Sequence, residues 1–277
     1  MKRLPFILTV SMMMLAAVSV TSCSDDDDNT DSMVGITQQD DEATAYLDDV
    51  QAEVDDLTMV DDSKSGAEYA TLDDQGQGTR TRKTAWEDGW RVDTITYVDF
   101  VNGYARFEKV KNGQLVIRVL GGPAQETFER EVTFVNFSIN GNRIEGQKRI
   151  VKTSAYTYTV TFQNGKITFT DGSTYTRTFE RTRTWADGYA TPYYVWDDVY
   201  TAEGSATGVN RNGKTYTHQI TNMIVNKMSC RWIVEGTIEM TVDGDVATFD
   251  YGDGECDNYA TVTHNGQSSQ VRLRGGF

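Results

Sequence analysis

The spacing of apolar residues divides the chain into a short helical part and a long part of strands. In residues 40–60 the apolar positions recur three or four apart, which predicts a helix with one apolar face. These positions are Ala43, Tyr46, Leu47, Val50, Val54, Leu57 and Val60. Asp40, Asp41 and Glu42 suit the start of this helix, because the helix dipole is positive there. Further acids near its end make it marginal unless it packs, either on the chain's own strands or on a partner protein.

From about residue 82 onward, apolar and polar residues alternate with a period of two. In residues 156–162 one face carries Tyr156, Tyr158, Val160 and Phe162, and the other carries Thr157, Thr159 and Thr161. Eleven Asn-Gly or Asp-Gly dipeptides start at positions 88, 102, 112, 140, 164, 171, 187, 212, 243, 253 and 265. Such dipeptides favour tight hairpin turns, in which both central residues have positive φ. We therefore expect an all-β fold of antiparallel hairpin and meander sheets, forming a sandwich or an elongated open sheet, preceded by one short N-terminal helix.

The turns also predict which residues lie opposite one another. A two-residue loop at positions 243–244 gives the pairs Val242–Asp245, Met240–Ala247, Ile238–Phe249 and Gly236–Tyr251, and the hairpin at 265–266 gives Ala260–Val271. The loop at 212–213 pairs Val209 with Tyr216, and a three-residue loop suits the turn at Asp171 best. Extended further, the register at 243–244 brings Cys230 within one residue of Cys256, an offset that a β-bulge absorbs. In an oxidising compartment this pair is a candidate disulfide.

The N-terminus has the layout of a secretory signal peptide: a basic start at Lys2 and Arg3, an apolar run, and small residues before Cys23. "VTSC" (residues 20–23) resembles the lipobox of bacterial lipoproteins, in which the cysteine is lipidated. "SDDDD" (residues 24–28) resembles the acidic export signal of Bacteroidota surface lipoproteins; a solvated acidic linker is the alternative. We therefore expect a lipoprotein signal peptide in 1–23, an acidic tether with a helix at about 40–60 in 24–80, and an antiparallel β domain in 81–277.

The acidity of the chain lies mostly in the predicted tether. The net charge is -15, but residues 24–75 hold 18 Asp and Glu against one Lys, while residues 76–277 hold 23 acids and 23 bases. A nearly neutral β domain has no basic face that would gather phosphates, so we expect no nucleic-acid partner.

Several segments of the predicted β domain carry a family resemblance. They include "TFVNFSINGNRIEGQKRI" (133–150), "GKITFTDGSTYTRTFERTRTW" (165–185), "GSATGVNRNGKTYT" (204–217), "CRWIVEGTIEM" (230–240) and "DYGDGECDNYATVTHNGQ" (250–267). In this order they resemble a family of Bacteroidota lipoproteins with no assigned activity. The resemblance implies a β-rich fold and an envelope location, and it implies no catalytic residue.

No spacing in the chain points to a catalytic or metal centre. The acids of residues 250–258, such as Asp250, Asp253 and Asp257, are either turn formers or a weak calcium site with fewer ligands than calcium prefers. The two histidines, His218 and His264, lack the spacing of zinc ligands and are expected to be structural or surface residues. We therefore expect no catalytic residue, no metal and no cofactor.

One stretch, residues 184–200, combines many aromatic side chains with carboxylates. It contains Trp185, Tyr189, Tyr193, Tyr194, Trp196 and Tyr200, together with Asp187, Asp197 and Asp198. The rings either fill the core at a sheet corner near Pro192 or form an exposed platform for sugars. The leading functional expectation is a lipid-anchored envelope protein, displayed at the outer-membrane surface, that binds or scaffolds a glycan or protein ligand without catalysis. The alternative is a surface glycan hydrolase or carbohydrate-binding protein that uses this stretch.

Overall fold

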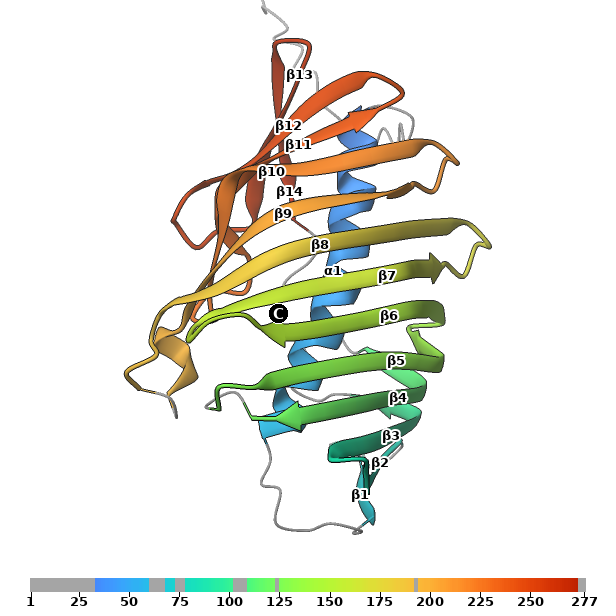
Figure 1. Cartoon of the computed structure of the whole chain (residues 1–277). Coiled ribbons are helices and arrows are strands. Elements are labelled where there is room, and N and C mark those ends of the chain that lie inside the picture. Colours follow the sequence, from blue (N-terminus) through green and yellow to red (C-terminus); the bar gives the residue numbers. More distant parts are fainter. Residues whose placement is uncertain are drawn as a thin grey trace, which may run out of the picture.

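The computed structural model describes residues 33–59, 68–72, 78–101, 109–122, 125–191 and 194–273. In these segments a helix, α1 (Met33–Met59), lies across one face of a single antiparallel sheet of 14 strands (Figure 1). A short 3₁₀ helix, η1 (Val195–Asp197), precedes β9. The prediction of an all-β fold with one N-terminal helix is confirmed, and the sheet has the elongated form rather than that of a sandwich.

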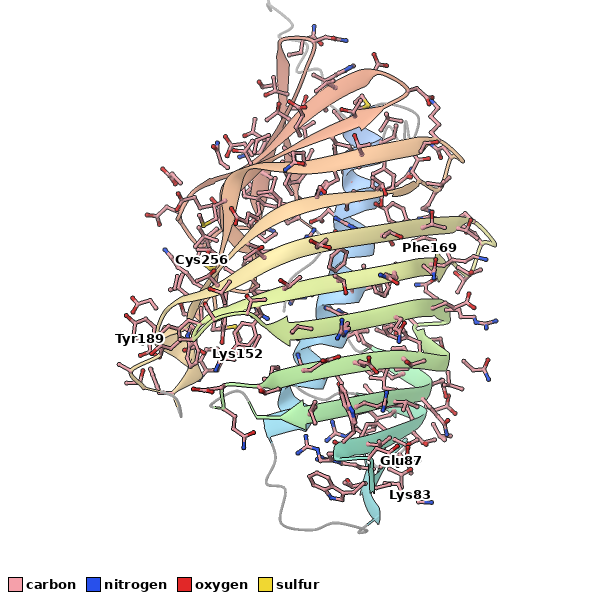
Figure 2. The ribbon with its side chains drawn as sticks, in the orientation of Figure 1. Lys83, Glu87, Lys152, Phe169, Tyr189 and Cys256 are labelled. Atoms are coloured by element: carbon pink, nitrogen blue, oxygen red, sulfur yellow. A yellow bond between two sulfur atoms is a disulfide. The ribbon has the colours of Figure 1, made fainter. Side chains whose placement is uncertain are left out.

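The strands lie in the sheet in the same order as in the chain. They are β1 (Glu68–Leu72), β2 (Thr79–Glu87), β3 (Trp90–Val101), β4 (Val110–Gly121), β5 (Phe128–Ile139), β6 (Asn142–Lys152), β7 (Thr157–Thr168), β8 (Thr174–Asp187), β9 (Val199–Val209), β10 (Thr215–Lys227), β11 (Ile233–Val242), β12 (Asp245–Asp253), β13 (Tyr259–His264) and β14 (Gln267–Arg272). Since neighbours are antiparallel, every second connection falls at the same end of the sheet. We call the end with connections 153–156, 188–198, 228–232 and 254–258 the loop end, and the opposite end the turn end. Figure 2 shows Lys152, Tyr189 and Cys256 toward the loop end, opposite Phe169.

The glycine dipeptides form several kinds of structure; those at 171, 187, 212 and 253 lie in or next to longer connections, where only the glycine has positive φ. Both residues have positive φ in the two-residue turns at 88–89, 140–141, 243–244 and 265–266, as predicted. By contrast, Asn112-Gly113 and Asn164-Gly165 lie inside β4 and β7, where they mark bulges instead of the expected turns. At Gly113 a Cβ would lie 2.1 Å from the carbonyl oxygen of Asn136, so glycine permits the close approach of β5. The dipeptide at 102–103 lies outside the described residues.

Most of the predicted register is confirmed. The pairs Val242–Asp245, Met240–Ala247, Ile238–Phe249 and Ala260–Val271 are present, and the turn at Asp171 closes through a bond from the Phe169 amide to the Ser173 carbonyl, 2.9 Å. The expected pair Gly236–Tyr251 is lost to a register shift between Glu235 and Thr237.

The predicted pair Val209–Tyr216 is wrong, because Val209 lies opposite Thr215. The loop is longer than two residues: the Asn210 side-chain oxygen accepts the amides of Asn212 and Lys214, each at 3.0 Å. His218 consequently lies opposite Ala206.

Register shifts occur in each successive strand pair from β3–β4 to β7–β8. Each extra residue bends its strand and increases the local twist. The sheet therefore curves, and α1 lies on its concave face (Figure 1).

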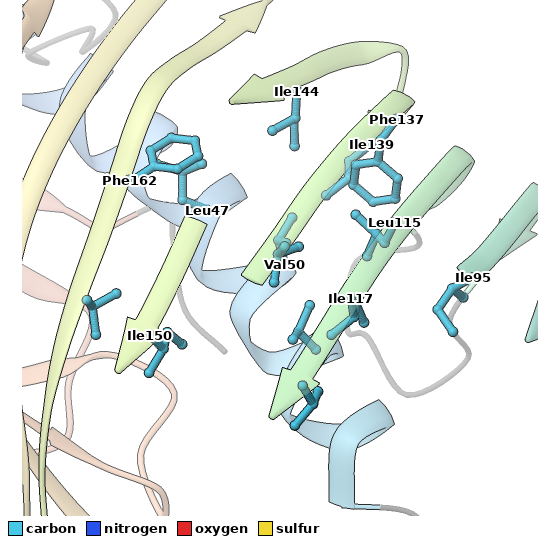
Figure 3. Close-up of a cluster of buried hydrophobic side chains, with 14 of the residues drawn as sticks. Leu47, Val50, Ile95, Leu115, Ile117, Phe137, Ile139, Ile144, Ile150 and Phe162 are labelled. Carbon is cyan, nitrogen blue, oxygen red and sulfur yellow. The ribbon is translucent and has the colours of Figure 1, made fainter. Parts of the chain in front are cut away.

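The helix docks on the chain's own sheet, which is the first of the two interpretations of its apolar face. Its buried apolar side chains are Met33, Ile36, Ala43, Leu47, Val50 and Val54. Leu47 and Val50 pack among residues of β3 to β7, as Figure 3 shows, whereas Met33 and Ile36 pack among residues of β7 to β14. One helix thus covers both halves of the concave face. Val60, the last residue of the predicted helix, lies outside the described residues.

The helix and the sheet both begin earlier than the sequence indicated. α1 starts at Met33, so the acids at 40–42 lie inside the helix and not at its N-terminus. Asp40 lies on the buried face of the helix. Because it is polar, it interrupts the apolar spacing, and the predicted helix therefore stops short of Met33. Strand β1, in the segment expected to be part of the acidic tether, pairs with β2, which itself begins at Thr79.

Asp40 anchors one half of the helix through a buried polar cluster. Its carboxylate accepts hydrogen bonds from the Tyr175 hydroxyl and from Arg177 Nη1, the latter at 3.2 Å. His218 Nε2 lies 3.5 Å from the other carboxylate oxygen. Burial alone would raise the pKa of Asp40, but the Arg177 charge and the Tyr175 hydrogen bond outweigh it and hold this pKa below its ordinary value. Burial lowers the pKa of His218 to about 3.

Glu53 anchors the other half in the same manner. It accepts hydrogen bonds from Lys111 Nζ, from the Tyr97 hydroxyl at 2.8 Å and from Arg80 Nη1 at 2.9 Å. Burial opposes ionisation, but Lys111 and its neighbours hold the pKa of Glu53 below its ordinary value. Breaking such a pair leaves an uncompensated buried charge, so both acids fix the position of α1 on the sheet.

We expect Glu53→Gln to lower the free energy of unfolding by about 3 kcal/mol, because Lys111 stays buried without a counter-charge. Glu42→Gln is the matched control, since its partner Arg211 and Glu42 itself are both partly exposed and such pairs contribute less than about 1 kcal/mol. Urea unfolding of both variants measures the difference. Equal losses would contradict a special role for Glu53.

We also expect the fold to lose stability between pH 7.5 and 5.0 because of His218. The unfolded chain binds a proton on this side chain below pH 6.5, whereas the folded chain stays neutral down to about pH 3. Stability contributed by neutral His218 is thus full above the unfolded pKa and declines as the pH falls, by about 2 kcal/mol at pH 5.0. Urea unfolding should show a smaller pH dependence in His218→Gln; an unchanged dependence would refute this origin.

Candidate functional site

The aromatic stretch comes together at the loop end of the sheet, beside a ring that the sequence did not point to. We call this group the ring site. It consists of Tyr156, Trp185, Tyr189, Tyr194, Trp196, Asp198 and Tyr200. Tyr156 lies in the β6–β7 connection, Trp185 near the end of β8, and Tyr200 at the start of β9. Tyr193, which belongs to the predicted platform, lies outside the described residues.

Four of the rings pack against one another. Tyr156 stacks on Tyr189 with ring centroids 4.5 Å apart and an interplanar angle of 27°. Trp185 meets Tyr156 edge to face at 6.3 Å and lies nearly parallel to Tyr200 at 6.0 Å. The Arg183 guanidinium lies 3.9 Å from the centroid of Tyr200. Mutual packing of this kind fixes the orientation of the rings before any ligand arrives.

Asp198 holds two of these rings through hydrogen bonds. Trp185 Nε1 donates to one carboxylate oxygen at 3.1 Å, and the Tyr200 hydroxyl donates to the other at 3.2 Å. The residue is only 5 % exposed, and burial raises the pKa of its carboxyl group. Gly188 fits beside it without a side chain, since a Cβ there would lie 2.4 Å from Asp198 Oδ1. Asp198 therefore acts as a support for the rings.

Two rings of the site project into solvent. Tyr194 is 58 % exposed and Trp196 is 61 % exposed. Tyr194 directly precedes η1 and Trp196 is its middle residue; Asp197, the last residue of η1, accepts a hydrogen bond from the Thr191 hydroxyl at 2.6 Å. Tyr189 and Tyr156 are also exposed in part. The interpretation that this stretch fills the core is therefore wrong for Tyr194 and Trp196.

Exposed aromatic faces beside polar groups suit the stacking of flat apolar surfaces, such as one face of a sugar ring. Glycoside hydrolysis would need two carboxyl groups facing each other across the substrate. Here Asp198 directs both oxygens to Trp185 and Tyr200, while Asp197 bonds to Thr191. Asp187 accepts the Gly188 amide at 2.9 Å. The carboxylates shape the loop, which fits a binding surface better than a catalytic pair.

The sequence did not indicate Tyr156, which belongs to the ring site, or Arg183, which contacts Tyr200 of that site. The Trp185 amide donates to the Tyr156 carbonyl at 2.8 Å, which brings the two residues together across β7 and β8. The bulge at Asn164 shifts this register by one residue. Without knowledge of the bulge, counting from the Asp171 turn does not place Tyr156 opposite Trp185.

The other candidate residues have structural roles. In the stretch 250–258, Asp250 accepts the Gly252 amide and Asp257 accepts the Tyr259 amide, both at 2.9 Å, so these acids form turns as expected. Cys230 and Cys256 form the expected disulfide. Within the described segments, no three His, Cys, Asp or Glu residues are grouped as metal ligands.

The remaining candidates are also accounted for. His218 is buried beneath α1, far along the chain from His264, which lies opposite Gln267. Glu129 and Glu131, two acids of β5 whose spacing could suggest a carboxylate pair, form ion pairs with Arg149 and Arg118 respectively. Cys23 and the rest of the signal segment lie outside the described residues.

Among the described residues, no helix has the length and apolar character that crossing a membrane requires. No protein-family model, curated protein or solved structure matches the chain.

Proposed function

We propose that the chain is a lipid-anchored protein of the cell envelope, displayed at the outer-membrane surface, which binds glycans through the ring site without catalysing a reaction. The observation that carries this proposal is the exposure of Tyr194 and Trp196 in the connection 188–198, which also carries the packed ring of Tyr189 and the supporting Asp198. Ordering a binding surface in advance reduces the entropy lost when a ligand binds.

Glycans are the ligand class that this surface fits best. Its exposed parts are flat aromatic faces, which stack on sugars, together with phenol hydroxyls and the Asp197 carboxylate, which can bond sugar hydroxyls. The occupied oxygens of Asp198 favour binding over hydrolysis, since a catalytic acid must reach the substrate.

The envelope location is supported by two features of the chain. The segment "VTSC" at residues 20–23 has the layout of a lipidation site, and acyl chains on Cys23 would hold the protein at a bilayer. The Cys230–Cys256 disulfide suits an oxidising compartment outside the cytoplasm. The acidic residues 24–28 favour display on the outer face.

We expect Trp196→Ala to weaken retention on glycans by up to about tenfold, because one stacking surface contributes up to about 1.5 kcal/mol. Affinity electrophoresis in gels containing β-glucan, xylan or mannan measures retention, after a wider glycan screen if none of these binds. Trp86→Ala is the control: Trp86 is similarly exposed, at 53 %, but lies in β2, away from the ring site. Thermal unfolding should be unchanged in both variants, and equal retention by both would refute the ring site as the binding surface.

We expect Cys23→Ser to abolish acylation and release the protein from membranes, because the lipid anchor is lost. Labelling with a palmitate analogue and fractionation of cells measure both effects. Protease treatment of intact cells tests on which face of the outer membrane the protein is displayed. Degradation of the wild-type domain is expected, and full protection would exclude display on the outer surface.

A further inference from the structure

The support of the ring site continues beyond Asp198 into the β10–β11 connection, residues 228–232. The Met228 amide donates to the main-chain carbonyl of Asp198 at 2.9 Å. Immediately beside this bond, Lys227 of β10 pairs with Val199 of β9. The main chain that carries the Asp198 carboxylate is therefore fixed on one side by the first residue of this connection.

The same connection is held on its other side by the β12–β13 connection, residues 254–258. Cys230 is joined to Cys256 by the disulfide, and the Cys230 amide donates to the Lys227 carbonyl at 2.8 Å. Lys227 Nζ donates to the Gly254 carbonyl, also at 2.8 Å. All these residues lie at the loop end, and Figure 2 shows Cys256 and Tyr189 toward this same end of the strands.

We propose that the Cys230–Cys256 disulfide is a positioning element of the ring site. It fixes residues 228–230, which fix the Asp198 main chain, and the Asp198 carboxylate in turn orients Trp185 and Tyr200. This inference rests on the proposed function only in so far as the oriented rings bind a ligand. The orientation itself is a property that can be measured without one.

The disulfide is accessible to reduction from one side. Cys256 is exposed, whereas Cys230 is only 3 % exposed. A thiolate of a dithiol reductant attacks Cys256 Sγ, the Cys230–Cys256 bond breaks, and Cys230 leaves as a thiolate that takes up a proton. The second thiol of the reductant then displaces Cys256, so that two electrons reduce the disulfide and the dithiol becomes a disulfide. Reduction therefore loosens the rings reversibly.

The experiment uses the full chain in detergent, labelled with ¹⁵N at tryptophan. The indole N–H of Trp185 donates to Asp198, so its exchange with deuterated solvent reports directly on this support. Trp185→Phe assigns the resonance. In Cys230→Ser/Cys256→Ser, and in the wild type reduced by dithiothreitol, the Trp185 indole should exchange at least tenfold faster, whereas the indole of Trp90 in β3 should not change.

A second variant separates positioning from general loss of stability. Met228→Pro removes the amide that donates to Asp198 and keeps the disulfide, and it should accelerate exchange at Trp185 in the same way. The proposal is overturned if Trp185 exchange is unchanged in the reduced protein, or if Trp90 accelerates equally.

Retention in gels containing β-glucan, xylan or mannan completes the test. Where the wild type is retained, the double serine variant should be retained at least tenfold less, and equal retention would overturn the proposal. If the wild type is retained by no glycan, the proposed function fails, while the exchange data still decide whether the disulfide positions the rings.

Discussion

An antiparallel sheet that is apolar on one face needs something to cover that face, and here a single helix meets this requirement. α1 reaches both halves of the concave surface, since its first turns pack near β12 to β14 and its later turns near β3 to β7. The apolar contacts supply most of the driving force but little direction. Asp40 and Glu53 fix the position of the helix on the sheet, because each acid pairs with a buried cation, Arg177 and Lys111 respectively. Both halves of the core depend on this docking.

The meander also gives the two ends of the molecule different roles. At the turn end, the connections at 140–141, 243–244 and 265–266 are two-residue turns that glycine dipeptides close. At the loop end, the four connections 153–156, 188–198, 228–232 and 254–258 are longer and carry the rings, the disulfide and the acids of residues 254–258. In a sheet whose strands follow the order of the chain, the connections at one end can change in length and sequence while the strands keep their pairing. Such connections suit a binding site.

The sequence indicated those parts of the fold that rest on local chemistry. Alternation identified the strands, and the turns at 243–244 and 265–266 set the register of their hairpins correctly. The sequence does not indicate where α1 starts, because Asp40 is a polar residue on the buried face of the helix. Its burial makes sense only once its partner Arg177 is known. Bulges at Asn112 and Asn164 were mistaken for turns, since the same dipeptide supplies positive φ in both settings. The exposure of Trp196 depends on how the loop end is assembled, and no local pattern records it.

The position of α1 ahead of all the strands has a consequence for how the chain folds. Neighbouring strands pair through short connections, so the sheet grows hairpin by hairpin from local contacts, which is a fast mode of folding. The helix is made first but packs in one core cluster with residues as far along the chain as Val271, so its docking has to wait for the last strands. During that interval an isolated helix is marginal in water, and its many carboxylates keep the segment soluble. The acidic composition therefore serves the chain twice: before folding as a guard against premature association, and afterwards as the source of the two anchors.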